Sequence, residues 1–236
     1  MQEVRDRLDG IRRRIAAAAL RGGRAADSVQ LVAVSKTVEV ARIREAMEAG
    51  QVLFGENRVQ EARGKAAELP AAHWHLVGHL QRNKAREAAR LFSMIHSVDT
   101  TELLRDLDRH ASERIEPLEV LIQVNLAGES SKNGARPEEV PEILAAGKGM
   151  RHIKVAGLMI LPPYDPDPER SRPFFRELAE VARGLDRRGF DNVSLRKLSM
   201  GMSEDFEVAV EEGATLIRIG RALFGERPAA GKKEQP

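Results

Sequence analysis

Lys36 ends an otherwise apolar run, Leu-Val-Ala-Val-Ser-Lys-Thr at 31–37. Apolar residues on both faces of a short segment are typical of a strand buried on both sides, as in a parallel sheet covered by helices. The lysine would then lie at the C-terminal end of that strand. Burial disfavours the charged form of an amine, and the neutral amine is the better nucleophile towards an aldehyde. The run therefore indicates either a lysine that forms a Schiff base or one that pairs with a carboxylate elsewhere in the chain.

A second chemical pattern is the turn Leu-Ser-Met-Gly-Met-Ser-Glu-Asp at 198–205. A strand ends here, Gly201 permits a close backbone approach, and Ser203 can cap the helix that follows. Unpaired amides at a helix start favour an anion, although the pattern alone fits an ordinary serine-capped turn equally well. A second glycine turn at Gly220 favours a phosphate site, because barrels often hold phosphate after strands seven and eight.

Arg218 interrupts a strand that is otherwise made of leucine and isoleucine. A guanidinium inside a barrel needs acceptors, and two assignments are open. It pairs with an acid such as Glu207 or Glu211, or it faces a heteroatom of a ligand. If that ligand is a pyridine ring, a permanently charged arginine keeps the ring nitrogen unprotonated and weakens the ring as an electron sink. The nearby methionines are either core packing or an apolar bed for such a ring: Met159, Met200 and Met202.

Three histidines occur close together in the sequence. His73 and His75 are two residues apart and would share one face of an extended strand, and His79 follows four residues after His75. Zinc and iron sites usually need a third or fourth ligand at a defined spacing, which the sequence does not supply, so we expect no metal. We expect His79 to line the mouth of the sheet and His73 to lie on the surface. Asn57 offers a donor and an acceptor without charge, although an asparagine before a helix is also a common cap.

The elements that carry these residues alternate along the chain. Eight apolar runs of strand type are separated by segments with helical periodicity, which predicts βαβ units and a parallel sheet. Eight such units in about 250 residues match a closed (β/α)8 barrel of the TIM type, which we favour over a doubly wound open sheet. The chemical residues then gather at one mouth, after the strand C-termini. The predicted strands are 31–35, 52–54, 75–77, 94–98, 118–124, 153–159, 193–198 and 216–219, and the helices 40–48, 58–69, 82–91, 102–112, 138–146, 174–188 and 204–211.

Three further segments complete the predicted organisation. Apolar residues recur at helical spacing between Val4 and Ile15, which predicts an extra N-terminal helix. The proline-rich stretch 161–168 predicts a rigid loop over the mouth. We expect residues 1–227 to form a single barrel domain. Residues 228–236, a polar tail, are expected to be disordered.

Composition excludes several classes of function. Hydrophobic residues make up 42% of the 236 and charged residues 31%, which suits a folded core with a solvated surface. The absence of cysteine excludes disulfides, thiolate metal sites and cysteine nucleophiles. The 38 basic residues nearly balance the 36 acidic ones and 4% are aromatic, which argues against nucleic-acid binding. The N-terminal segment has neither signal-peptide nor membrane-spanning character, so we expect a cytoplasmic protein without membrane contact.

Seven segments in order along nearly the whole chain carry a family pattern. They are Ala-Val-Ser-Lys-Thr at 33–37, Phe-Gly-Glu-Asn-Arg-Val-Gln-Glu at 54–61, Trp-His-Leu-Val-Gly-His-Leu-Gln-Arg-Asn-Lys at 74–84, Gln-Val-Asn at 123–125, Gly-Leu-Met at 157–159, Leu-Ser-Met-Gly-Met-Ser-Glu-Asp-Phe at 198–206 and Arg-Ile-Gly-Arg-Ala-Leu-Phe-Gly at 218–225. The sequence thereby resembles the pyridoxal-phosphate homeostasis proteins, barrels that bind pyridoxal 5′-phosphate (PLP) and have a fold like that of the alanine racemase N-terminal domain.

The resemblance implies roles for individual residues. Lys36 would form a Schiff base with PLP, Arg218 would face the pyridine nitrogen, and the turns at 199–203 and at Gly220 would hold the phosphate. Together with the candidates from the residues themselves, the expected cofactor-binding set is Lys36, Asn57, His79, Met159, Ser199, Met200, Gly201, Met202, Arg218 and Gly220.

Three functions are compatible with this set. We favour a non-catalytic monomer that buffers or delivers PLP, with transient contacts to PLP-dependent apoenzymes, in vitamin B6 and amino-acid homeostasis. The alternative is a weak PLP enzyme of the racemase or decarboxylase type, with Lys36 as its base. Alanine racemase takes a second base, a tyrosine, from a separate C-terminal domain; we expect no such domain here, and the single tyrosine, Tyr164, falls in the proline-rich loop. The third is a Schiff-base aldolase for a sugar phosphate, with Glu56 as the carboxylate near Lys36.

Overall fold

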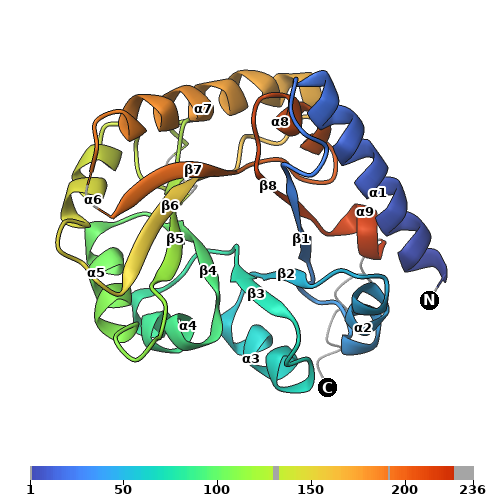
Figure 1. The fold of residues 1–236 in the computed structure, drawn as a ribbon, viewed down its shortest axis with the longest axis horizontal. Coiled ribbons are helices and arrows are strands. Elements are labelled where there is room, and N and C mark those ends of the chain that lie inside the picture. The colour runs from blue at the N-terminus through green and yellow to red at the C-terminus, as the bar shows by residue number, and fades with distance from the viewer. Residues whose placement is uncertain (1, 130–132, 191, 226–236) are drawn as a thin grey trace, which may run out of the picture.

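The computed structural model of the protein describes residues 2–129, 133–190 and 192–225. Eight parallel strands close into a barrel in which each strand pairs with the next in sequence and the eighth pairs with the first (Figure 1). The predicted barrel is therefore confirmed, and the open sheet is wrong. The strands are β1 (Gln30–Val34), β2 (Leu53–Glu56), β3 (His73–Leu76), β4 (Met94–Val98), β5 (Leu118–Val124), β6 (Ile153–Ile160), β7 (Val193–Ser199) and β8 (Leu216–Ile219).

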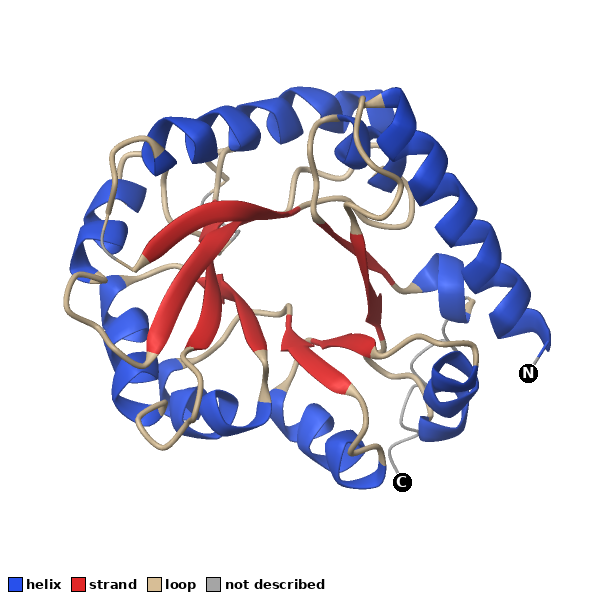
Figure 2. Ribbon diagram, in the orientation of Figure 1, coloured by secondary structure: helices blue, strands red, loops and turns tan. Residues whose placement is uncertain are grey.

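The helices form an outer layer around the strands (Figure 2). Every helical segment that periodicity predicted is present, with ends shifted by a few residues. The structure adds η2 and α9, which were not predicted because four residues are too short to show a periodic pattern. The helices are α1 (Gln2–Arg21), α2 (Val40–Glu48), α3 (Val59–Glu68), η1 (Arg82–Lys84), α4 (Ala85–Leu91), α5 (Thr101–His110), α6 (Val140–Ala146), η2 (Pro168–Ser171), α7 (Arg172–Asp186), α8 (Phe206–Glu211) and α9 (Arg221–Phe224).

The extra N-terminal helix is α1, which runs along the outside of the barrel beside α8 and α9 (Figure 1). Its predicted apolar stripe is buried, with Val4 and Leu8 wholly covered and Ile11 and Ile15 almost so. Because α9 has only four residues, it cannot cover its part of the barrel wall alone. The buried stripe of α1 completes that part of the helical layer.

The core has two parts because alternate residues of a barrel strand point inwards and outwards. The outer part lies between strands and helices. The inner part fills the barrel with side chains such as Val32, Met94, Leu121 and Met159. Strands covered on both faces lack a regular polar alternation, which is why most of their positions are apolar. Buried polar residues such as His96 in β4 and Arg218 in β8 are exceptions. The barrel interior is thus filled with side chains.

Candidate functional site

A cavity of about 690 Å³ opens where the C-terminal ends of the strands meet. Its walls come from the end of β1, from the segments that follow β1, β2, β3, β6 and β7, from β8 and from the start of α9. The lining residues are Val34, Lys36, Asn57, Val77, Leu161, Met202, Ser203, Glu204, Arg218, Gly220 and Arg221. This is the mouth at which the sequence placed its chemical residues.

Half of the predicted cofactor-binding set lines this cavity: Lys36, Asn57, Met202, Arg218 and Gly220. His79 lines a neighbouring cavity of about 330 Å³, which shares Asn57 with the first.

The other four predicted site residues lie beneath the cavity surface. Met159 is fully buried among the side chains inside the barrel. Ser199 and Met200 are also fully buried, and Gly201 is buried in the turn between them and Met202. Any contribution of these four residues is therefore to the shape and the support of the cavity wall.

The turn after β7 is held close to its own helix, as its glycine predicted. Gly201 has φ +91°, and a Cβ there would lie 2.6 Å from Cβ of Ala209, so a larger residue is excluded. The prediction that Ser203 caps the following helix is wrong, because α8 begins at Phe206. The Ser203 hydroxyl instead accepts a hydrogen bond from the Ala222 amide at 3.2 Å, in the first turn of α9. The two glycine turns are thereby joined.

Arg218 is inside the barrel and 4% exposed. It donates to Ser199 Oγ at 2.6 Å and to the carbonyl oxygen of Ile160 at 2.8 Å. Neither acid that the sequence suggested pairs with it: Glu207 binds Arg14, and Glu211 binds Arg21 and Arg172. Burial lowers the pKa of Arg218 to about 10, so the guanidinium is charged at neutral pH and forms a fixed cationic wall of the cavity.

A chain of hydrogen bonds continues from Arg218 across the barrel interior. Ser199 Oγ lies 2.8 Å from His96 Nδ1, and His96 Nε2 lies 2.9 Å from His75 Nδ1. Burial, followed by the positive charge of Lys197, lowers the pKa of His75 to about 3. Burial likewise lowers the pKa of His96, with His75 and Arg218 as further causes. Both imidazoles are therefore neutral at neutral pH.

Arginine can only donate, so Ser199 Oγ accepts from Arg218. Two arrangements of protons satisfy the rest of the chain, because a hydroxyl oxygen can accept twice. Either the serine hydroxyl donates to His96 Nδ1 and His96 Nε2–H donates to His75 Nδ1, or His96 Nδ1–H donates to Ser199 Oγ and His75 Nδ1–H donates to His96 Nε2. His96 was not among the predicted site residues, although a histidine inside the apolar run Met-Ile-His-Ser-Val at 94–98 was a signal for it.

Glu56 is the carboxylate that the aldolase alternative would place near Lys36. It is fully buried, and its Oε1 accepts hydrogen bonds from Ser35 Oγ at 2.6 Å and from Lys65 Nζ at 2.8 Å. Burial raises its pKa, and the bond from Lys65 opposes that rise. Lys65 was not predicted as a site residue, because charged side chains on helices are usually exposed.

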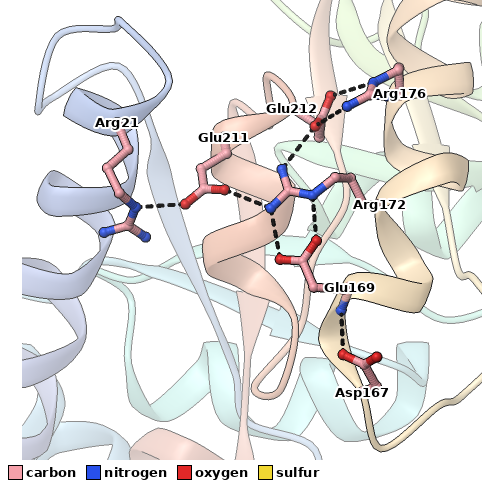
Figure 3. A network of polar contacts seen from close by, with 7 residues as sticks. All are labelled: Arg21, Asp167, Glu169, Arg172, Arg176, Glu211 and Glu212. Atoms are coloured by element: carbon pink, nitrogen blue, oxygen red, sulfur yellow. Dashed lines mark hydrogen bonds and ion pairs between the residues drawn. The ribbon is translucent and has the colours of Figure 1, made fainter.

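The proline-rich segment 161–168 forms a loop beside the mouth. Its first residue, Leu161, lines the cavity, and Tyr164 is 76% exposed. Its end is anchored by Arg172, whose guanidinium binds acids of η2 and of the C-terminal end of α8 (Figure 3). The network drawn there comprises Arg21, Asp167, Glu169, Arg172, Arg176, Glu211 and Glu212. It ties the loop to α8 and, through Arg21, to α1.

The predicted histidine group is divided by the fold. His73 is exposed, as expected, whereas His75 is buried. Across the described ranges, no three histidine, aspartate or glutamate side chains come together in a group that could hold a metal ion.

Within the same ranges, no helix has the length and apolar character needed to cross a membrane.

Comparisons with known proteins fit this geometry. The family model of the alanine racemase N-terminal domain matches residues 7–228. The pyridoxal phosphate homeostasis protein of Aquifex aeolicus is 43% identical over 224 residues, which are 94% of this chain and 97% of that protein. The one from Pseudomonas aeruginosa is 42% identical over 231 residues, covering 96% and 97%. The solved structure of PipY from Synechococcus elongatus with PLP bound is 40% identical, has a TM-score of 0.83, and covers 94% of this chain and 100% of that one.

Proposed function

The chain belongs to the alanine racemase N-terminal domain family, and to the pyridoxal phosphate homeostasis proteins within it, and from this premise we propose that it binds PLP and buffers or delivers it without catalysing a reaction. The observation that carries the proposal is that Lys36 and Arg218 line one cavity together with the two glycine turns. An amine, a fixed cation and a pair of anion-binding turns are the groups that an aldehyde-bearing pyridine phosphate would need.

The residues present fit such a ligand. The cavity volume lies within the range of about 300–1,000 Å³ that is usual for small-molecule sites. Val34, Val77 and Leu161 supply an apolar wall for a flat ring. The backbone at Ser203 and Gly220 supports a phosphate site, because turns and helix starts present N–H groups that bind anions.

Each polar group has a defined task in this proposal. When bound, PLP supplies an aldehyde that condenses reversibly with an amine, forming a C=N bond and releasing one water. Lys36 provides the amine and so acts as a reversible tether. Arg218, fixed by Ser199 and Ile160, would keep the ring nitrogen unprotonated, which would weaken the ring as an electron sink. Tethering without strong carbanion stabilisation suits a carrier better than an enzyme.

The remaining expectations enter the proposal in the same way. Asn57 and His79 would contact the ligand or the entrance, since they line the two adjoining cavities. We further propose that the protein acts in the cytoplasm as a monomer, with transient contacts to apoenzymes, and that residues 1–227 form the cofactor-binding domain. The expected tail, residues 228–236, lies outside the described residues.

The test is covalent labelling at Lys36. The protein is mixed with PLP, reduced with borohydride and digested, and the peptides are weighed by mass spectrometry. We expect a pyridoxyl phosphate group on the Lys36 peptide, its loss in Lys36→Ala, and its retention in Lys84→Ala, which changes a lysine of the adjoining cavity. A reducible chromophore that persists in Lys36→Ala would place the tether on another lysine.

A second measurement separates the carrier from the weak enzyme. Loaded protein is incubated with amino acids in D2O, and exchange of the α-hydrogen is followed by NMR. We expect no exchange above that of PLP alone in solution. Saturable exchange that disappears in Lys36→Ala would replace the carrier by a racemase-type enzyme.

A further inference from the structure

A cluster of charged side chains lies directly behind the backbone that carries Lys36. Lys65, from the middle of α3, is 7% exposed. Its ammonium donates to Glu56 Oε1 at 2.8 Å and to Glu61 Oε1 at 2.6 Å. The third bond goes to the carbonyl oxygen of Ser35, at 2.6 Å. An ammonium has three N–H groups, so its donors are fully used and the cation is fixed in one place.

The same cluster holds the backbone on both sides of Lys36. The Ser35 carbonyl, which precedes Lys36, accepts from Lys65. The Thr37 amide, which follows it, donates to Glu61 Oε1 at 2.6 Å. Thr37 has φ +62°, a left-handed conformation that costs a β-branched residue on the order of 1–2 kcal/mol. The bond to Glu61 stabilises the chain in that conformation.

Both peptide groups of Lys36 are thus tied to one rigid pair, Glu61 and Lys65. The planes of two successive peptide groups set the backbone dihedrals of the residue between them, and so the direction of its Cα–Cβ bond. For Lys36 that direction leads into the cavity shared with Arg218. A misplacement of about 1 Å at a reacting group can cost on the order of a hundredfold in rate.

We propose that Glu61 and Lys65 are positioning residues for Lys36, which hold its two peptide groups so that its amine meets the aldehyde in a reactive orientation. The inference rests on the proposed function, because it concerns the reaction of Lys36 with PLP. Glu56 is the third charged residue of the cluster, through its bond to Lys65. It is fully buried, and its Oε2 accepts no hydrogen bond in the described part of the chain.

Glu61 is the residue to vary. Removing Lys65 would leave two carboxylates facing each other in a buried site, which would confuse loss of folding with loss of positioning. The Glu61 side chain is 27% exposed, so its removal is tolerated better. Glu61→Gln keeps an oxygen that can accept from the Thr37 amide, whereas Glu61→Ala keeps none. Glu68→Ala, at an exposed position of the same helix, is the matched control for loss of one carboxylate.

The experiment measures two quantities. The first is the rate at which the reducible PLP adduct forms at Lys36, followed by borohydride quenching and mass spectrometry. The second is the circular dichroism of the bound chromophore. We expect Glu61→Ala to slow the rate between about tenfold and about a hundredfold and to change the dichroic band. Glu61→Gln should restore most of the rate and most of the dichroic band, and Glu68→Ala should match the parent protein in both measurements. If Glu61→Ala does not fold, Glu61→Asp replaces it, since its shorter chain cannot reach the Thr37 amide and Lys65 together, and the same slowing is expected.

The outcomes separate the two proposals. A parent protein that forms the adduct at Lys36, with Glu61→Ala or Glu61→Asp equally fast and with an unchanged dichroic band, overturns the positioning role and leaves the proposed function intact. Slowing in Glu61→Ala that Glu61→Gln does not restore also overturns it, because the backbone hydrogen bond is then not the cause. A parent that forms no adduct overturns both.

Discussion

The buried imidazole of His75 should make the protein sensitive to mild acid, whatever ligand it binds. His75 contacts His96 inside the barrel, and burial lowers its pKa from 6.5 to about 3. The folded protein therefore leaves this imidazole neutral, while the unfolded chain protonates it below about pH 6.5. The stability that comes from the neutral imidazole is complete above pH 6.5 and is lost as the pH falls towards 3.

The size of the effect follows from the two pKa values. At pH 5, protonation stabilises the unfolded chain at this site by about 2 kcal/mol, and at pH 7 by about 0.2 kcal/mol. Protonation of His75 stabilises the folded state by almost nothing at either pH, because the pKa of His75 in the folded state is about 3. His75 should therefore remove about 2 kcal/mol from the free energy of unfolding between pH 7 and pH 5, which is large for a single residue.

The assay is urea unfolding of the parent and of His75→Gln at both pH values. Glutamine has an amide that can still bond to His96 but cannot be protonated. We expect the variant to lose about 2 kcal/mol less than the parent on going from pH 7 to pH 5. His73→Gln, on the exposed end of the same strand, controls for loss of any imidazole. Equal pH dependence in the parent and in His75→Gln, or an NMR titration of His75 with a midpoint above pH 5.5, would refute the reasoning.

Three further predictions concern stability and use denaturant unfolding. Gly157→Ala should lower the free energy of unfolding by more than about 3 kcal/mol or prevent folding, because a Cβ at Gly157 would lie 1.7 Å from a backbone oxygen of β7. As the control, Gly64→Ala in α3 meets no atom within 4 Å and should raise the free energy of unfolding by about 0.5–1 kcal/mol. Arg172→Met should cost about 1 kcal/mol at low salt and less in 1 M NaCl, because the pairs it breaks are partly exposed; an equal cost at both salt concentrations would contradict an ionic origin. Ser199→Ala should cost about 1–3 kcal/mol, since it leaves a buried donor of Arg218 without its acceptor.

The strands could be read from the sequence because a strand covered on both faces is rich in apolar residues, whichever face they point to. The predicted ranges 94–98, 118–124 and 216–219 agree with β4, β5 and β8 to the residue. The start of α8 could not be read in the same way. A serine before a helical segment is a local capping signal, but the Ser203 hydroxyl binds Ala222, nineteen residues further along the chain. A contact of that range leaves no local pattern.

The same distinction applies to the candidate site. Lys36 and Arg218 were conspicuous because each interrupts an apolar run, and both line the cavity. Lys65 has no such contrast around it, since a lysine in a helix with several other charged residues is expected to face solvent. Its burial is made possible by the acceptors that the fold brings to it from the residue after β1, from β2 and from α3. The residues that support a site are therefore harder to predict than those that line it.

The distribution of energetically costly groups gives an argument for a ligand site that does not depend on relatives. A buried guanidinium lines the cavity, two buried neutral imidazoles continue its hydrogen-bond chain, and a buried ammonium and a left-handed threonine hold the backbone beside Lys36. Apolar residues in such places often stabilise a protein more than the ionic groups that they replace. Lys65 nevertheless has an acceptor for each of its three N–H groups, and Arg218 donates to two acceptors. Arg218 lines the cavity and Lys65 holds the backbone next to Lys36, so their costs are concentrated around one cavity. Stability alone does not account for that concentration, whereas a rigid, charged mouth built to hold an anionic, aldehyde-bearing ring does.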